Sequence, residues 1–119
     1  MKAFVLLLVP LSIFGQTTFS DITLDSGIDN IYDVYQGLFG GGVVAFDYNN
    51  DGNEDLFITG GQGQDVLYKN NGDGTFKDVT IESGLFKEKL IVTTGASSAD
   101  VNKDGFIDLF VTTIASEAN

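Results

Sequence analysis

Two short acidic segments, residues 47–55 and 100–108, share the pattern Asp-x-Asn-x-Asp-Gly-x-x-Asp and are the residues best suited to chemistry. In a tightly curled loop, side-chain oxygens at positions 1, 3, 5 and 9 can converge on one point, and Gly at position 6 permits the turn. The backbone carbonyl at position 7 can add a further oxygen, and Ca²⁺ takes about six to eight such ligands. We therefore expect two Ca²⁺ sites. Their ligands are Asp47, Asn49, Asp51, Asn53 and Asp55 in the first loop, and Asp100, Asn102, Asp104, Phe106 and Asp108 in the second.

Other interpretations of these loops agree less well with their residues. Asn, Asp and Gly also form ordinary hairpin turns, but three carboxylates within nine residues repel one another in a turn without a cation. An EF-hand requires Glu at position 12, where this chain has Ile58 and Val111. Mg²⁺ needs a stricter octahedral geometry, and Zn²⁺ prefers nitrogen and sulfur ligands. We expect the Ca²⁺ ions to be structural and assign no catalytic residue.

The composition excludes several other kinds of function. The chain has 119 residues, with 17 Asp and Glu against 6 Lys and no Arg, and a formal net charge of −11. It contains no Cys or His, so Ser-His-Asp and Cys-His centres, zinc fingers and disulfides are excluded. Nucleic acid and anionic membranes are disfavoured as partners, because binding to phosphates depends on Lys and Arg. With 43% hydrophobic residues, the chain is expected to fold.

The first 15 residues have the features of a secretory signal peptide. Lys2 is followed by an apolar run from Ala3 to Phe14 and then by the small residue Gly15. The run is shorter than the roughly 20 residues of a membrane span, and Pro10 interrupts it. We expect a signal peptide at 1–15, no membrane span, and a protein that is secreted or displayed at the cell surface. A buried first strand or an uncleaved anchor is the alternative.

The rest of the chain contains an internal repeat. Residues 18–28 match residues 75–85 at six of eleven positions, an offset of 57. Residues 47–59 match residues 100–112 at eight of thirteen positions, an offset of 53. Two matches in the same order indicate one structural unit of about 55 residues that begins twice.

Each unit has the pattern of short strands joined by polar turns. Apolar, β-branched runs at 43–46 and 56–59 flank the first acidic loop, which is typical of a hairpin. Runs at 65–69 and 75–81 flank an Asn-Gly turn, which predicts a second hairpin. No stretch keeps a helical period over ten residues. A four-stranded antiparallel unit of this length is typical of one blade of a β-propeller.

The sequence therefore predicts an all-β chain of about two propeller blades. We expect an outer strand at 17–24, a first blade over about 38–81 and a second, incomplete blade over about 90–119. Because a propeller closes with about four to eight blades, the chain is expected to be the N-terminal fragment of a longer protein. A ring assembled from several short chains, and a small metal-stabilised domain of two hairpins, are the alternatives.

Three segments resemble FG-GAP/VCBS-type repeats: residues 41–59, residues 67–76 and residues 78–80. Their order is closest to the N-terminal repeats of secreted bacterial proteins with a C-terminal ASPIC/UnbV domain, which are similar to cartilage acidic proteins. The resemblance covers about 100 residues and implies a seven-bladed, integrin-α-like β-propeller with Ca²⁺ in the blade hairpins. The second unit departs from the pattern at 97–99, where Ser-Ser-Ala replaces the Val-Ala-Phe of 44–46.

Two classes of function remain open. The first, which we favour because the chain has no His or Arg, is a non-enzymatic adhesion module that presents loops to a carbohydrate or protein ligand. The second is the propeller part of a secreted carbohydrate-active enzyme, a lyase or hydrolase. Unpaired blade faces would bind the remaining blades of the same chain or a second copy. Candidate sugar-stacking residues are Tyr32, Tyr35 and Tyr48, and the acids outside the loops include Asp29, Asp33, Glu82 and Glu88.

Overall fold

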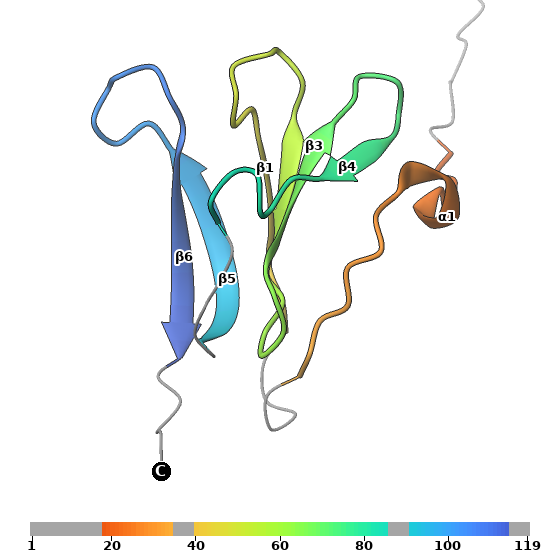
Figure 1. The fold of residues 1–119 in the computed structure, drawn as a ribbon, viewed down its shortest axis with the longest axis horizontal. Coiled ribbons are helices and arrows are strands. Elements are labelled where there is room, and N and C mark those ends of the chain that lie inside the picture. Colours follow the sequence, from red (N-terminus) through yellow and green to blue (C-terminus); the bar gives the residue numbers. More distant parts are fainter. Residues whose placement is uncertain (1–17, 35–39, 86–90, 115–119) are drawn as a thin grey trace, which may run out of the picture.

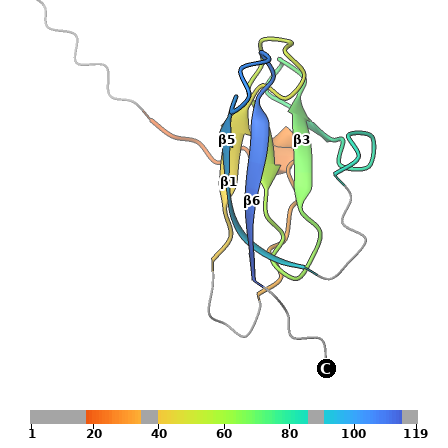
Figure 2. The same cartoon turned by 90° about the vertical axis from the view of Figure 1, so that its left-hand side faces the viewer.

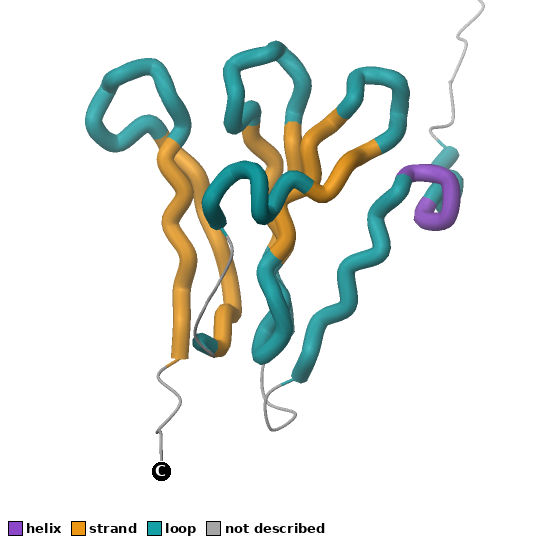
Figure 3. Tube along the Cα trace, viewed as in Figure 1, coloured by secondary structure: helices purple, strands orange, loops and turns teal. Residues whose placement is uncertain are grey.

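The computed structural model describes residues 18–34, 40–85 and 91–114 and contains two antiparallel β-sheets (Figure 1). Apart from the four-residue helix α1 (Thr23–Ser26), the described residues form strands and loops, which confirms the all-β prediction (Figure 3). The predicted signal peptide at 1–15 lies outside the described residues. No described helix is long and apolar enough to cross a bilayer. The strands are β1 (Val43–Phe46), β2 (Asp55–Ile58), β3 (Val66–Asn70) and β4 (Phe76–Asp78) in the first sheet, and β5 (Val92–Ala99) and β6 (Asp108–Ile114) in the second.

The strand pattern of the first unit agrees with the sequence. Strands β1 to β4 are neighbours in chain order, and each pair is antiparallel. Asn70 pairs with Phe76 across the Asn-Gly turn, which confirms the second hairpin, although β4 ends at Asp78 and not at residue 81 as the apolar run predicted. Four sequential antiparallel strands make one propeller-type blade. The hairpin of β5 and β6 repeats β1 and β2 in the second unit, as the internal repeat predicted.

The N-terminal segment differs from the predicted outer strand at 17–24. Residues 18–22 form no strand, and α1 begins at residue 23. Among the described residues no strand of either sheet is paired with this segment, so its backbone belongs to no ladder. The Asp21 carboxylate instead accepts hydrogen bonds from N and Oγ1 of Thr23, at 3.0 and 2.7 Å. These local bonds shape the turn that follows Asp21.

The same turn occurs again after β4. In both copies a Thr donates two hydrogen bonds to an Asp carboxylate, and a Ser donates to the carbonyl of that Thr. A glycine then closes each turn, with φ of 78° in the first copy and 80° in the second. The two copies of the sequence therefore fold alike locally. The equivalent residues are Asp21 and Asp78, Thr23 and Thr80, Ser26 and Ser83, and Gly27 and Gly84.

The hydrophobic core lies between the two sheets. Figure 2 shows β5 and β6 stacked in front of the first sheet. The backbones approach closely at Gly42 and Gly95, because a Cβ on Gly42 would lie 2.8 Å from the Gly95 Cα. Each sheet therefore covers a face of the other. The buried core residues are Phe46, Phe57, Leu67 and Val79, and the second sheet packs on them with Ala96, Leu109 and Val111.

A tyrosine attaches the N-terminal segment to the first sheet. Tyr68 on β3 is 1% exposed, and its hydroxyl donates to the Asp29 carboxylate at 2.9 Å. The Asp29 amide donates to the same hydroxyl at 3.2 Å. Burial, followed by the hydrogen bond to Asp29, raises the pKa of Tyr68 to about 12. Asp33 forms a parallel bridge with Gly61, so the segment is attached at two points.

The raised pKa of Tyr68 predicts a loss of stability in alkaline solution. The folded chain holds this proton up to a pKa of about 12, whereas the unfolded chain releases it near the ordinary value of 10.0. The stabilisation is therefore complete below about pH 10 and is lost as the pH rises towards 12. Urea unfolding at a series of alkaline pH values should show this decline, and Tyr68→Phe should weaken it. An identical decline in the variant would contradict the assignment.

Truncation of Phe57 tests the core between the sheets. Phe57 is 2% exposed, so we expect Phe57→Ala to lower the free energy of unfolding by about 3–5 kcal/mol through lost contacts and a new cavity. Phe110→Ala is the matched control, because Phe110 on β6 is 67% exposed and should lose less than about 1 kcal/mol. Urea denaturation measures both. Equal losses would mean that the two sheets do not pack as described.

Candidate metal centre

The two acidic loops lie at the same end of the stacked sheets. One connects β1 to β2 and the other connects β5 to β6, and the β3–β4 turn lies at this end as well (Figure 1). The two loops are in contact, because Asn50 Nδ2 donates to the carbonyl oxygen of Gly105 at 3.2 Å. Stacking of the two units therefore brings both predicted sites into one surface region.

The first loop is closed by its own side chains. Asp47 accepts the amides of Asp51 and Gly52, at 3.0 and 2.7 Å. Asn49 Oδ1 also accepts the Asp51 amide, at 3.0 Å, so two predicted ligand oxygens lie around one backbone nitrogen. Asp51 in turn accepts the amide of Asn53 at 3.0 Å. Gly52 has φ of 87°, a backbone conformation that glycine adopts readily and other residues rarely do. This explains the glycine at position 6 of the pattern.

The second loop repeats these bonds one for one. Asp100 accepts the amides of Asp104 and Gly105, at 3.1 and 3.0 Å, and Asn102 accepts the Asp104 amide at 3.0 Å. Asp104 accepts the amide of Phe106 at 2.9 Å. Gly105 has φ of 89°. The two copies of the sequence pattern therefore produce two copies of one loop conformation.

The last acid of each loop is turned towards the protein backbone. Asp55 is fully buried, and its two oxygens accept the amides of Tyr48 at 3.1 Å and Asn70 at 2.7 Å. It therefore joins the first loop to the end of β3. Asp108 accepts the equivalent amide, that of Val101, at 3.0 Å in a more exposed position. A carboxylate has about four lone-pair positions, so these bonds leave acceptor capacity for a cation.

Lys69 belongs to this site, although the sequence did not single it out. From β3 its Nζ lies 2.5 Å from Oδ2 of Asp51. This hydrogen bond is the main reason that the pKa of the Asp51 carboxyl lies well below its usual range. The same bond raises the pKa of Lys69. Sequence reasoning missed Lys69 because it lies 18 residues from Asp51 and on another strand. No local pattern marks it.

The donor set of the loops suits a hard cation. Within the described ranges no group of three or more His, Cys, Asp or Glu side chains is placed to hold a metal ion by itself. The set predicted from the sequence also includes side-chain amide and backbone oxygens. In the first loop the Lys69 ammonium lies against Asp51, so this position accommodates a positive charge. The residues present are compatible with Ca²⁺, and their role as its ligands remains a prediction.

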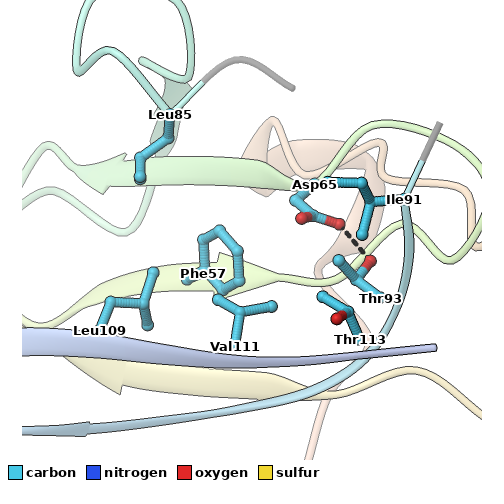
Figure 4. Close-up of a pocket in the computed structure, with 8 residues that line it drawn as sticks. All are labelled: Phe57, Asp65, Leu85, Ile91, Thr93, Leu109, Val111 and Thr113. Carbon is cyan, nitrogen blue, oxygen red and sulfur yellow. Dashed lines mark hydrogen bonds between the residues drawn. The ribbon is translucent and has the colours of Figure 1, made fainter. Parts of the chain in front are cut away.

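A cavity of about 250 Å³ lies between the two sheets (Figure 4). Asp65 is the carboxylate among its lining residues, and it accepts hydrogen bonds from Thr93 Oγ1 at 2.5 Å and from the Gly60 amide at 2.8 Å. Asp65 therefore joins β5 to the loop between β2 and β3. The other lining residues are Phe57, Leu85, Ile91, Leu109, Val111 and Thr113.

The acids that the sequence analysis named outside the loops have separate surroundings. Asp29 bonds to the buried tyrosine of β3, as described above. Glu82 forms an ion pair with Lys77 at 2.9 Å. Asp33 is exposed and bridges to the loop after β2 through its backbone. Glu88 lies outside the described residues. These acids belong to different contacts and are not brought together as a site.

The described tyrosines are also used in packing. The ring of Tyr32 lies close to Gly41 and Gly61, where a Cβ atom would approach it to 2.7 and 3.0 Å. Its hydroxyl oxygen is buried. Tyr48 packs on the hydrophobic core. Both side chains are half-buried, and Tyr35 lies outside the described residues.

Comparison with known proteins agrees with this arrangement of strands and loops. Residues 47–111, more than half of the chain, match the FG-GAP-like repeat. The chain therefore belongs to the FG-GAP-like repeat family, and its sheets are blade units of a propeller-type fold. It is 30% identical to cartilage acidic protein 1 of Xenopus tropicalis over 95 residues, which are 80% of this chain and 14% of that protein. The chain thus spans about one seventh of that relative. No solved structure matches the chain.

Replacement of Asp55 tests the role of its buried carboxylate. Asp55→Asn puts an NH₂ group against one of the two backbone donors, so we expect a loss of about 2–4 kcal/mol in the free energy of unfolding. Asp108→Asn is the matched control, because Asp108 is more exposed and accepts the single equivalent amide. It should lose less than about 1.5 kcal/mol. Urea denaturation in the presence of a chelator measures both variants without a contribution from metal binding. Equal losses of unfolding free energy in the two variants would contradict the role given to the Asp55 carboxylate.

Proposed function

We propose that the chain is a calcium-stabilised part of a secreted or cell-surface binding or adhesion module. The observation that carries this proposal is the repeated geometry of the two acidic loops. They differ at four of nine positions, yet both turn the same acceptor oxygens towards the same amides. Ordinary turns form with one or two Asx side chains, whereas each loop here has three carboxylates and one Asn at fixed spacing.

Calcium would act on this chain as a structural staple. The ligands we propose are the five residues of each loop predicted from the sequence, with the carbonyls of Asn53 and Phe106 among them. A bound divalent ion would offset repulsion among the carboxylates of a chain whose net charge is −11. With a Kd of about 10⁻⁴ M and about 10⁻³ M Ca²⁺, values typical of extracellular modules, each site adds about 1.4 kcal/mol to the free energy of unfolding.

Export is the second part of the proposal. It rests on the pattern of a signal peptide at 1–15. It also rests on the weak affinity proposed for the Ca²⁺ sites, because weak sites are filled only where the Ca²⁺ concentration is high. The similar protein of Xenopus tropicalis carries the name cartilage acidic protein 1, and the acidity of this chain agrees with that name.

The ligand we propose for the module is a carbohydrate or a protein. The family match is to a repeat that builds a fold, not to an active site. The acids outside the loops have structural partners or separate positions in the described part of the chain. No observation on these residues favours the alternative of a carbohydrate-active enzyme.

Calorimetric titration of chelator-treated protein with Ca²⁺ tests the proposal. We expect two binding sites and a higher melting temperature by circular dichroism, because each ion binds the folded loops. Asp51→Ala combined with Asp104→Ala should abolish both effects. Asp73→Ala is the control, since Asp73 lies in the neighbouring β3–β4 turn and bonds only Thr75. Folded protein that takes up no Ca²⁺ would overturn the proposal.

A further inference from the structure

A lysine from β3 forms an ion pair with the first acidic loop, whereas the second loop has a lysine of its own, Lys103, that forms no ion pair among the described residues. The Lys69 ammonium lies on Asp51, with the two side chains 32% and 28% exposed. In the described part of the chain no lysine forms an ion pair with an acid of the second loop. Two loops with the same backbone therefore differ in the ion pairing of their carboxylates.

The position of Lys69 is set by both of its neighbours in β3. Tyr68 is buried and bonded to Asp29, and the Asn70 amide donates to Asp55. Asn70 Nδ2 also donates to the Glu54 carbonyl at 3.0 Å. The backbone on each side of Lys69 is therefore attached, and the side chain extends from a fixed base to the loop.

We propose that Lys69 is the resident counter-ion of the first loop, which stabilises this loop without metal and competes with a divalent cation for Asp51. The proposal rests on calcium binding by the loops, the function proposed above. It makes the two sites unequal: the ion pair stabilises the first loop in the absence of Ca²⁺ and weakens its binding of the ion. The second loop, whose Lys103 forms no ion pair among the described residues, binds Ca²⁺ without this competition.

The physical reason is that one carboxylate oxygen serves two cations. A divalent ion held by Asp51 would lie a few ångströms from the ammonium, and the two positive charges would repel. The pair is partly exposed, so solvent and salt screen this repulsion and the expected effect is moderate. Binding to the first loop therefore requires Lys69 to leave Asp51, a cost that the second loop does not have.

Lys69→Met in the full chain tests the proposal. We expect this variant to bind Ca²⁺ at the first loop roughly three- to tenfold more tightly, because the competing charge is gone. In excess chelator, Lys69→Met should melt at a lower temperature than the native chain. In saturating Ca²⁺, it should melt at the same temperature as the native chain or a higher one. Terbium luminescence excited through Tyr48 reports the first loop, since the second has Val101 at that position. Ca²⁺ is then titrated against bound terbium, and calorimetry follows both loops.

Lys77→Met is the matched control. Lys77 on β4 is paired with Lys69 in the sheet register and forms an ion pair with Glu82. Lys77→Met therefore removes the same charge from the same sheet. It should leave both affinities unchanged. Lys69→Gln keeps a long polar side chain without charge, and it replaces Lys69→Met if that variant does not fold.

Each outcome decides the proposal. Tighter binding at the first loop alone, with Lys77→Met unchanged, supports it. If the native chain binds Ca²⁺ and both Lys69 variants bind it with the same affinity, this inference is overturned and the proposed calcium function stands. An equal gain at both loops, or the same gain in Lys77→Met, also overturns it, because net charge then explains the change. Absence of Ca²⁺ binding in every folded variant overturns the calcium function and this inference together.

Discussion

The buried carboxylate of Asp55 holds together the end of the molecule that carries the loops. It starts β2, closes the first acidic loop through the Tyr48 amide, and bonds the Asn70 amide at the end of β3. A buried carboxylate is costly unless its oxygens accept hydrogen bonds, and here backbone donors from two elements satisfy it. The geometry of the loop, the register of the first sheet and the position of Lys69 all depend on this residue.

Stacking of the two repeats covers an apolar face of each. A small antiparallel sheet needs a covered apolar face, and the second hairpin covers the face that bears Phe57 and Leu67. The close approach of Gly42 and Gly95 allows the two backbones to come together. The same stacking brings the acidic loops into contact through Asn50 and Gly105. Packing and the arrangement of the candidate site therefore have a common cause.

The family match and the loop geometry point to a protein whose surface is built on rigid blades. Both acidic loops are at one end, joined to strands that are buried on their inner face. In such a scaffold the blades supply position, and the loops supply the groups that meet a partner. Among the described residues a lysine forms an ion pair with an acid of the first loop and none does so with the second, so a structural repeat need not be an electrostatic repeat.

Features that depend on neighbours along the chain followed from the sequence. The strand order of the first unit and the second hairpin were expected, because they follow from turn residues and apolar runs that are close together in the chain. The bonds of Asp47 and Asp100 to backbone amides were not, because the sequence predicted these side chains as Ca²⁺ ligands.

Tertiary structure decided the features that depend on distant neighbours. Residues 18–28 and 75–85 have related sequences, yet only the second copy contains a strand, because only it has β3 beside it. Lys69 reaches Asp51, and Asp55 reaches Asn70, only when β2 and β3 pair. A local pattern carries no information on which strand will lie alongside it, so the charge at the first loop was set by the pairing of the sheet.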